Sequence, residues 1–179
     1  HLEAILNHIA RSRPGTEVIL PYQSGLSMEV DLKNEIQVIV NNISLNQPDS
    51  AISINPIGVF EEEGRRTFKI STYLSEVDTN IVLLPSFDPG FIQNICRQLS
   101  QLSEDKAIIL YGMPNWGEFE EINLDYLVQL NYHFTSEKWL DKENPIFKQL
   151  EREHKREMNN PPHDYFYLGY DLSRFFTGL

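Results

Sequence analysis

Three short segments place groups that can bind a small polar molecule directly after apolar runs of sequence. They are residues 22–25 (Tyr-Gln-Ser-Gly), 86–90 (Ser-Phe-Asp-Pro-Gly) and 111–116 (Tyr-Gly-Met-Pro-Asn-Trp). Their hydroxyl and amide groups can hydrogen-bond a ligand, and their aromatic rings can pack against it. A ligand-facing rim at the ends of three strands is one interpretation. In the other, the glycines and prolines only end the strands.

The sequence contains no complete constellation for catalysis or for a cofactor. It has no Gly-x-Gly-x-x-Gly or Gly-x-x-x-x-Gly-Lys-[Ser/Thr] pattern for a nucleotide and no Gly-x-Ser-x-Gly nucleophile turn. Cys96 lies on the apolar side of an expected helix, which favours a buried thiol over a nucleophile. The histidines lack metal-ligand spacing; they are His1, His8, His133, His154 and His163. We therefore predict a protein that is not an enzyme and holds no metal or cofactor.

Charge and composition exclude further classes of function. The chain has 15 basic and 26 acidic residues and a formal net charge of -11, which disfavours nucleic acid as a partner. No apolar run approaches the roughly 20 residues needed to span a bilayer. The acidic group Glu118, Glu120 and Glu121 has the spacing of a solvated helix start more than that of a calcium site. The chain opens at His1 in a helical pattern, so we interpret it as a piece of a longer protein.

Apolar periodicity predicts the elements that position the three segments. Helical spacing over 2–9 is followed by a strand over 17–22 that Pro21 ends, and then by a helix from Met28 to Val40. Apolar runs at 81–84 and 107–111 enclose a helix over 91–102. This alternation predicts a three-layer α/β/α domain, a doubly wound, Rossmann-like parallel sheet. We expect one such domain over residues 1–179.

The other segments give weaker patterns. Residues 57–60 fit a short strand or a loop, 61–66 a charged hairpin or solvated loop, and 122–130 a helical face. Residues 132–134 could form a further strand. Asn144 and Pro145 predict a helix start, with an N-cap followed by proline at the first helical position. A last helix is expected to start at Tyr170.

The C-terminal part of the sequence resembles the closing signature of the type I periplasmic binding proteins, the leucine-binding and receptor-ligand-binding family. The residues that carry this resemblance are Leu150, His154, Met158, Pro162, Tyr165 and Gly169-Tyr170-Asp171. Upstream, Leu84-Pro85-Ser86 with its following helix, and then Leu110-Tyr111-Gly112 with Trp116 beyond it, resemble the second lobe of the same family.

The resemblance implies the C-terminal lobe of a two-lobed binding protein that closes by a hinge motion around a small polar solute such as an amino acid. It implies a periplasmic or cell-envelope location and the preceding lobe as a partner within the same protein. Because some relatives are fused to LysM repeats, a LysM domain is a second expected neighbour. The alternative is a structural or interaction module with a degenerate cleft in a peptidoglycan-linked, LysM-type protein. Such relatives often carry cell-wall amidase labels, and no metal or nucleophile set here supports that chemistry.

Amino-acid binders of that family contact their ligand through loops at strand ends. By this resemblance the expected ligand-binding residues are Tyr22, Ser24, Ser86, Phe87, Asp88, Tyr111 and Trp116. Asp88 could pair with a ligand ammonium. A helix N-cap ahead of Phe91 is the interpretation that we prefer for this residue.

Overall fold

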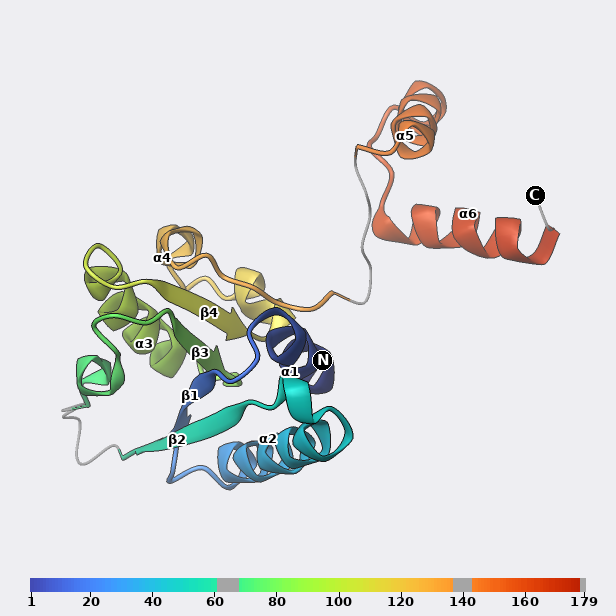
Figure 1. Ribbon diagram of the computed structural model, residues 1–179. Coiled ribbons are helices and arrows are strands. Elements are labelled where there is room, and N and C mark those ends of the chain that lie inside the picture. Colours follow the sequence, from blue (N-terminus) through green and yellow to red (C-terminus); the bar gives the residue numbers. More distant parts are fainter. Residues whose placement is uncertain (61–67, 137–142, 178–179) are drawn as a thin grey trace. The chain divides into compact units, whose positions relative to one another are not determined.

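The computed structural model of the chain (Figure 1) describes residues 1–60, 68–136 and 143–177. The chain divides into two compact units, His1–Ser136 and Glu137–Leu179. Among the described residues, all named strands belong to the first unit. The expectation that residues 1–179 form one lobe of a larger two-lobed protein stays a prediction.

The first unit is built on a parallel sheet of four strands, as the sequence predicts. The strands are β1 (Glu17–Gln23), β2 (Ser53–Val59), β3 (Asn80–Leu84) and β4 (Ile108–Gly112), in the order β2-β1-β3-β4. Every residue of β3 is buried, because a central strand of a doubly covered sheet faces helices on both sides.

Helices cover both faces of this sheet. They are α1 (Leu2–Ser12), α2 (Ser27–Asn46), α3 (Pro89–Leu102) and α4 (Leu124–Gln129). The crossovers β1-α2-β2 and β3-α3-β4 leave the sheet centre in opposite directions, so the right-handed rule puts α2 and α3 on opposite faces. Helix α1 contacts α2, and α4 contacts α3. Figure 1 shows α1 and α2 on one side of the strands and α3 on the other, a three-layer α/β arrangement.

Three short 3-10 helices join these elements: η1 (Pro48–Ser50), η2 (Ile70–Tyr73) and η3 (Pro114–Glu118).

The helix α3 illustrates why the larger elements form where they do. Asp88 caps its first turn, Pro89 occupies the first helical position, and its apolar face is buried. Cys96 lies on that face, and burial raises the pKa of its thiol to about 12. The prediction of a buried thiol is confirmed.

Two strand predictions differ from the structure. β1 continues through Pro21 to Gln23. Pro21 pairs with β2, and the pairing of β1 with β3 has already ended at Ile19. A proline, which has no N–H to donate, is therefore tolerated at this position. β2 begins at Ser53, well before Ile57. Its Pro56 and Gly58 are exposed, as an edge strand allows, and this composition hides the strand in the sequence.

Two C-terminal predictions also need correction. Residues 132–134 form no named strand; they make a single parallel bridge, in which the His133 N–H donates to Leu110 O at 2.7 Å. The last helix, α6 (Asp164–Thr177), begins six residues before Tyr170, so Gly169-Tyr170-Asp171 lies inside it. The charged hairpin or loop expected at 61–66 lies outside the described residues.

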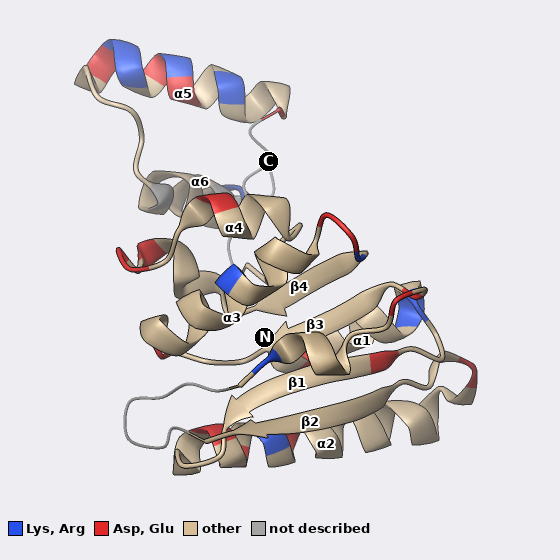
Figure 2. Ribbon diagram, turned by 90° about the vertical axis from the view of Figure 1, so that its left-hand side faces the viewer, with Lys and Arg blue, Asp and Glu red and all other residues tan. Residues whose placement is uncertain are grey.

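The second unit contains α5 (Pro145–Met158) and α6. The side chain of Asn144 accepts a hydrogen bond from the Ile146 N–H at 2.9 Å, which confirms the predicted helix start. Acidic and basic residues alternate along α5 (Figure 2), and none of its residues is buried. In the described part of the chain, no helix combines the length and the apolar character needed to cross a membrane.

We predict that Gly112→Ala destabilises the first unit by about 1–3 kcal/mol. A Cβ atom at Gly112 would overlap the buried indole of Trp116. Gly117→Ala is the matched control, because a Cβ there meets nothing within 4 Å. Urea unfolding of the two variants should separate them, and equal stabilities would contradict this account of the β4 end.

Candidate functional site

The most promising position for a ligand is the point where the connections of the sheet diverge. The chain passes outward from β1 to β2 on one side and from β3 to β4 on the other, so the switch lies between β1 and β3. Open α/β sheets bind ligands just beyond the carboxyl ends of the strands at such a point. Here these ends lead into residues 24–26 and 85–88, which overlap two of the segments singled out in the sequence, 22–25 and 86–90.

A buried carboxylate joins these two segments. Glu29, in the first turn of α2, is 2% exposed. Its Oε2 accepts the Gln23 backbone N–H at 2.6 Å, and its Oε1 accepts Gln23 Nε2 at 3.1 Å and the Ser86 hydroxyl at 2.5 Å. The helix N-terminus adds a favourable dipole for this negative charge. Glu29 therefore links α2, the end of β1 and the loop after β3.

Ser86 and Asp88 extend the network toward α3. The Ser86 hydroxyl accepts the Asp88 N–H at 3.2 Å, and Asp88 Oδ1 accepts the Phe91 N–H at 2.9 Å. The N-cap role preferred for Asp88 is confirmed. Its other oxygen lies 3.4 Å from Gln23 Nε2, at the long end of hydrogen bonding. The side chain stays partly exposed beside the rim.

Trp116, in η3 after β4, supports the same loop. Its ring is fully buried, and its indole N–H donates to the Ser86 carbonyl at 3.0 Å. It stacks on Tyr132 at 5.0 Å between ring centroids, and Tyr132 stacks on Phe134 at 5.3 Å. The Tyr132 hydroxyl donates to Met113 O. Protein atoms thus cover the Trp116 ring that the resemblance would offer to a ligand.

Tyr111 is likewise enclosed. Its ring contacts those of His8 and His133, with centroids 6.2 Å and 5.1 Å away. Burial raises the pKa of the Tyr111 phenol, and the nearby Arg13 charge opposes this shift. Tyr111 therefore packs α1 and the His133 segment against β4.

The remaining expected residues are accessible. The exposed fraction of Phe87 is 39%, and Tyr22 and Ser24 are partly exposed. The Ser24 backbone N–H and hydroxyl both donate to Val59 O, at 3.1 and 3.2 Å, which ties this loop to the end of β2. Of the seven expected ligand-binding residues, the structure leaves four at least partly open at the rim: Tyr22, Ser24, Phe87 and Asp88. It buries three: Ser86, Tyr111 and Trp116.

Sequence reasoning missed Glu29, and it left Gln23 and Asn115 out of the expected ligand contacts although both lie in the segments singled out. The signal for Glu29 was available, because Glu29, Ile36 and Val40 share one buried face of α2 and a carboxylate on an apolar face needs partners. Asn115, in the loop after β4, has a buried Oδ1 that meets no donor among the described residues.

Among residues 1–60, 68–136 and 143–177, no group of three or more His, Cys, Asp or Glu side chains is placed to hold a metal ion. What the arrangement offers is a rim of hydroxyl, carboxylate and aromatic groups on loops held by buried hydrogen bonds.

Comparison with known proteins adds no relative: no family model, no curated protein and no solved structure matches this chain. The α/β fold therefore rests on the structure itself, and the family remains a resemblance.

Replacing the central carboxylate tests the network. We predict that Glu29→Gln destabilises the protein by about 1–3 kcal/mol, because the amide places N–H groups opposite donors of Gln23 or Ser86. Glu35→Gln, at an exposed position of the same helix, should change stability by no more than about 0.5 kcal/mol. Equal unfolding midpoints in urea would refute a joining role for Glu29.

The packing around Tyr111 predicts a pH dependence. Burial lowers the pKa of His133 below 6.5, and the charges of His8 and Arg13 lower it further. The unfolded chain then takes up this proton first, so the His133 contribution to stability falls as the pH drops through about 6.5. The free energy of unfolding should depend on pH less steeply in His133→Phe, which keeps an aromatic ring on Tyr111. An unchanged slope between about pH 5 and pH 8 would contradict the assignment.

Proposed function

We propose that this chain provides a non-enzymatic lobe for binding a small polar solute, such as an amino acid, in a cell-envelope protein like the type I periplasmic binding proteins. The lobe would work with a second lobe by hinge closure. The location would be periplasmic or at the cell envelope, with the preceding lobe and a LysM domain as neighbours in the same protein.

One observation carries the proposal. The loops after β1 and β3 meet at the switch point of the sheet and are locked to each other through Glu29. A site that is ordered before the ligand arrives loses little conformational entropy on binding. Such a rigid half-site suits closure by movement of whole lobes.

The chemistry of the rim supports a small polar ligand. Asp88 offers a partly exposed carboxylate to an ammonium or hydroxyl group, Ser24 offers a hydroxyl, and Phe87 offers an exposed ring. No arginine lies in the two loops, 24–26 and 85–88. We therefore favour recognition of the donor end of the solute by this lobe.

A second candidate function is the interaction module with a degenerate cleft. It is favoured by the way the polar groups of Gln23, Glu29 and Ser86 satisfy one another. The burial of Tyr111 and Trp116 also removes two of the expected ligand contacts from the surface.

A titration followed by amide chemical shifts distinguishes the two functions. The ¹⁵N-labelled chain would be titrated separately with each common L-amino acid, glucose and N-acetylglucosamine. We predict that at least one amino acid shifts the amides of Ser24, Gly25, Phe87 and Asp88. If every solute leaves these amides unmoved in a folded chain, the binding-lobe proposal fails and the interaction module replaces it.

Asp88→Asn tests the rim carboxylate in the same titration. Asparagine keeps the helix cap, so stability should hold, while removal of the charge should weaken binding of the amino acid by about tenfold. Asp105→Asn is the matched control, because Asp105 is exposed in the turn before β4, at the other edge of the sheet. Equal affinities of the two variants would exclude Asp88 as a ligand contact.

A further inference from the structure

A hollow lies at the amino-terminal edge of the sheet, opposite the rim. It is a cleft of about 580 Å³ at the starts of β1 and β3. Buried Ile19 contributes to its lining, and its other residues come from two loops, 13–17 and 73–80. This volume lies in the range of clefts that hold small molecules. None of its residues belongs to the rim at the switch point.

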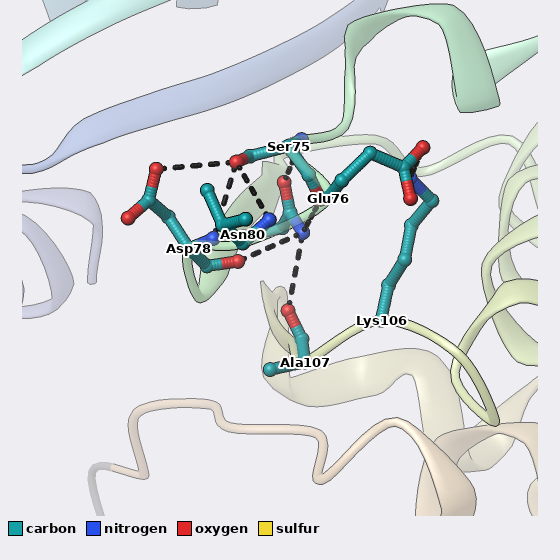
Figure 3. A network of polar contacts seen from close by, with 7 residues as sticks. Ser75, Glu76, Asp78, Asn80, Lys106 and Ala107 are labelled. Carbon is teal, nitrogen blue, oxygen red and sulfur yellow. Dashed lines mark hydrogen bonds and ion pairs between the residues drawn. The ribbon is translucent and has the colours of Figure 1, made fainter.

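One wall of the cleft is built around a buried amide. Asn80 is 4% exposed, and its Oδ1 accepts the Ser75 N–H at 2.7 Å. Its Nδ2 donates to the backbone oxygens of Ser75, Asp78 and Ala107 at 3.1, 3.3 and 3.2 Å (Figure 3). Because both ends of the amide are used, the 75–78 turn is held in one shape before any ligand arrives.

The same turn presents a carboxylate. The Ser75 hydroxyl donates to Asp78 Oδ2 at 3.1 Å and accepts the Asp78 N–H at 3.1 Å. Glu76 pairs instead with Lys106 (Figure 3). In this view the Asp78 carboxylate points away from Lys106, and among the described residues the ion pair of Lys106 is with Glu76. Among the described residues, Asp78 Oδ1 accepts no hydrogen bond and can meet a donor from a ligand.

The other wall presents a cation. Arg13 follows the last turn of α1, is exposed, and has no ion pair with a carboxylate among the described residues. Hydroxyl groups of Thr16, Tyr73 and Thr79 line the same cleft. Glu17, also in the lining, accepts a hydrogen bond from Asn55 at 3.1 Å. The cleft therefore offers a guanidinium and a carboxylate from separate loops. Its hydroxyl groups add uncharged hydrogen-bonding partners.

We propose that this amino-edge cleft binds a small zwitterion, an amino acid or dipeptide, whose carboxylate pairs with Arg13 and whose ammonium pairs with Asp78. A simple anion fits less well, because two carboxylates line the cleft and the chain has a net charge of -11. A neutral solute would leave both charged walls unpaired. This site is separate from the proposed ligand rim at the carboxyl edge.

The probe for this proposal is L-alanyl-L-alanine, followed by amide chemical shifts of the ¹⁵N-labelled full chain. We expect the dipeptide to shift the amides of Gly15, Thr16, Ser75 and Thr79. Its N-acetylated and amidated form, which lacks both charges, should leave these amides unchanged. Shifts confined to Ser24, Phe87 and Asp88 would overturn this proposal while supporting the rim site.

Variants then test the two charged walls. Arg13→Gln and Asp78→Asn should each weaken the dipeptide by about tenfold, the loss expected for one charged hydrogen bond. Arg11→Gln, one exposed position of α1 that does not line the cleft, should bind like the parent chain. Arg13 is exposed, so its variant should keep the parent spectrum and remain informative if Asp78→Asn alters the turn. Binding that is indifferent to Arg13→Gln, or absent at about 50 mM dipeptide, overturns the proposal.

Discussion

The hydrogen bonds to the buried Glu29 carboxylate are the interaction on which the carboxyl edge of the sheet depends. An ionised group withdrawn from water costs several kcal/mol unless it is well hydrogen-bonded, so its donors cannot move away independently. Those donors belong to the end of β1 and to the loop after β3. A single buried charge thus makes the positions of α2, β1 and β3 mutually dependent at the point where the sheet topology would place a ligand.

The dependence continues outward through Ser86. Its hydroxyl bonds Glu29 and receives the Asp88 N–H, so the network reaches the cap of α3. Its carbonyl accepts the Trp116 indole N–H, which brings in the loop after β4. Trp116 can occupy this place only because Gly112 has no Cβ, so a backbone feature of β4 supports the loop of its neighbouring strand. The rim is therefore rigid through contacts that lie beneath it.

Local patterns predicted much of this fold. The apolar run of β3, the Asn144 start of α5 and the Asp88 cap of α3 each depend on neighbours in sequence, and each was predicted correctly. β2 was underestimated because its edge position tolerates polar residues, proline and glycine. The segment around His133 makes a single bridge to β4 in place of the expected strand, and its apolar pattern alone does not show how far the pairing extends.

The candidate site was harder to predict than the fold for a similar reason. Position at a strand end was enough to select Ser86, Asp88 and Trp116, but it does not tell whether a side chain turns to solvent or to the interior. That choice was made by partners remote in sequence, Glu29 for the Ser86 hydroxyl and Ser86 for the Trp116 indole. A buried acid on an apolar helix face requires hydrogen-bond donors. Glu29 was therefore the residue from which the inward direction of the Ser86 hydroxyl could have been inferred.

The two edges of the sheet use their polar groups differently, and this contrast separates support from recognition. At the carboxyl edge the buried groups of Gln23, Glu29 and Ser86 bond mainly to one another, which gives the rim its shape and leaves its outer side chains accessible. At the amino edge Asn80 holds the 75–78 turn through its hydrogen bonds. Arg13 and Asp78 line the cleft beside it. In both places a fully bonded buried group stabilises a loop whose exposed neighbours remain available. A buried polar residue here therefore marks the support of a loop, and the accessible side chains are those one or two positions away from it.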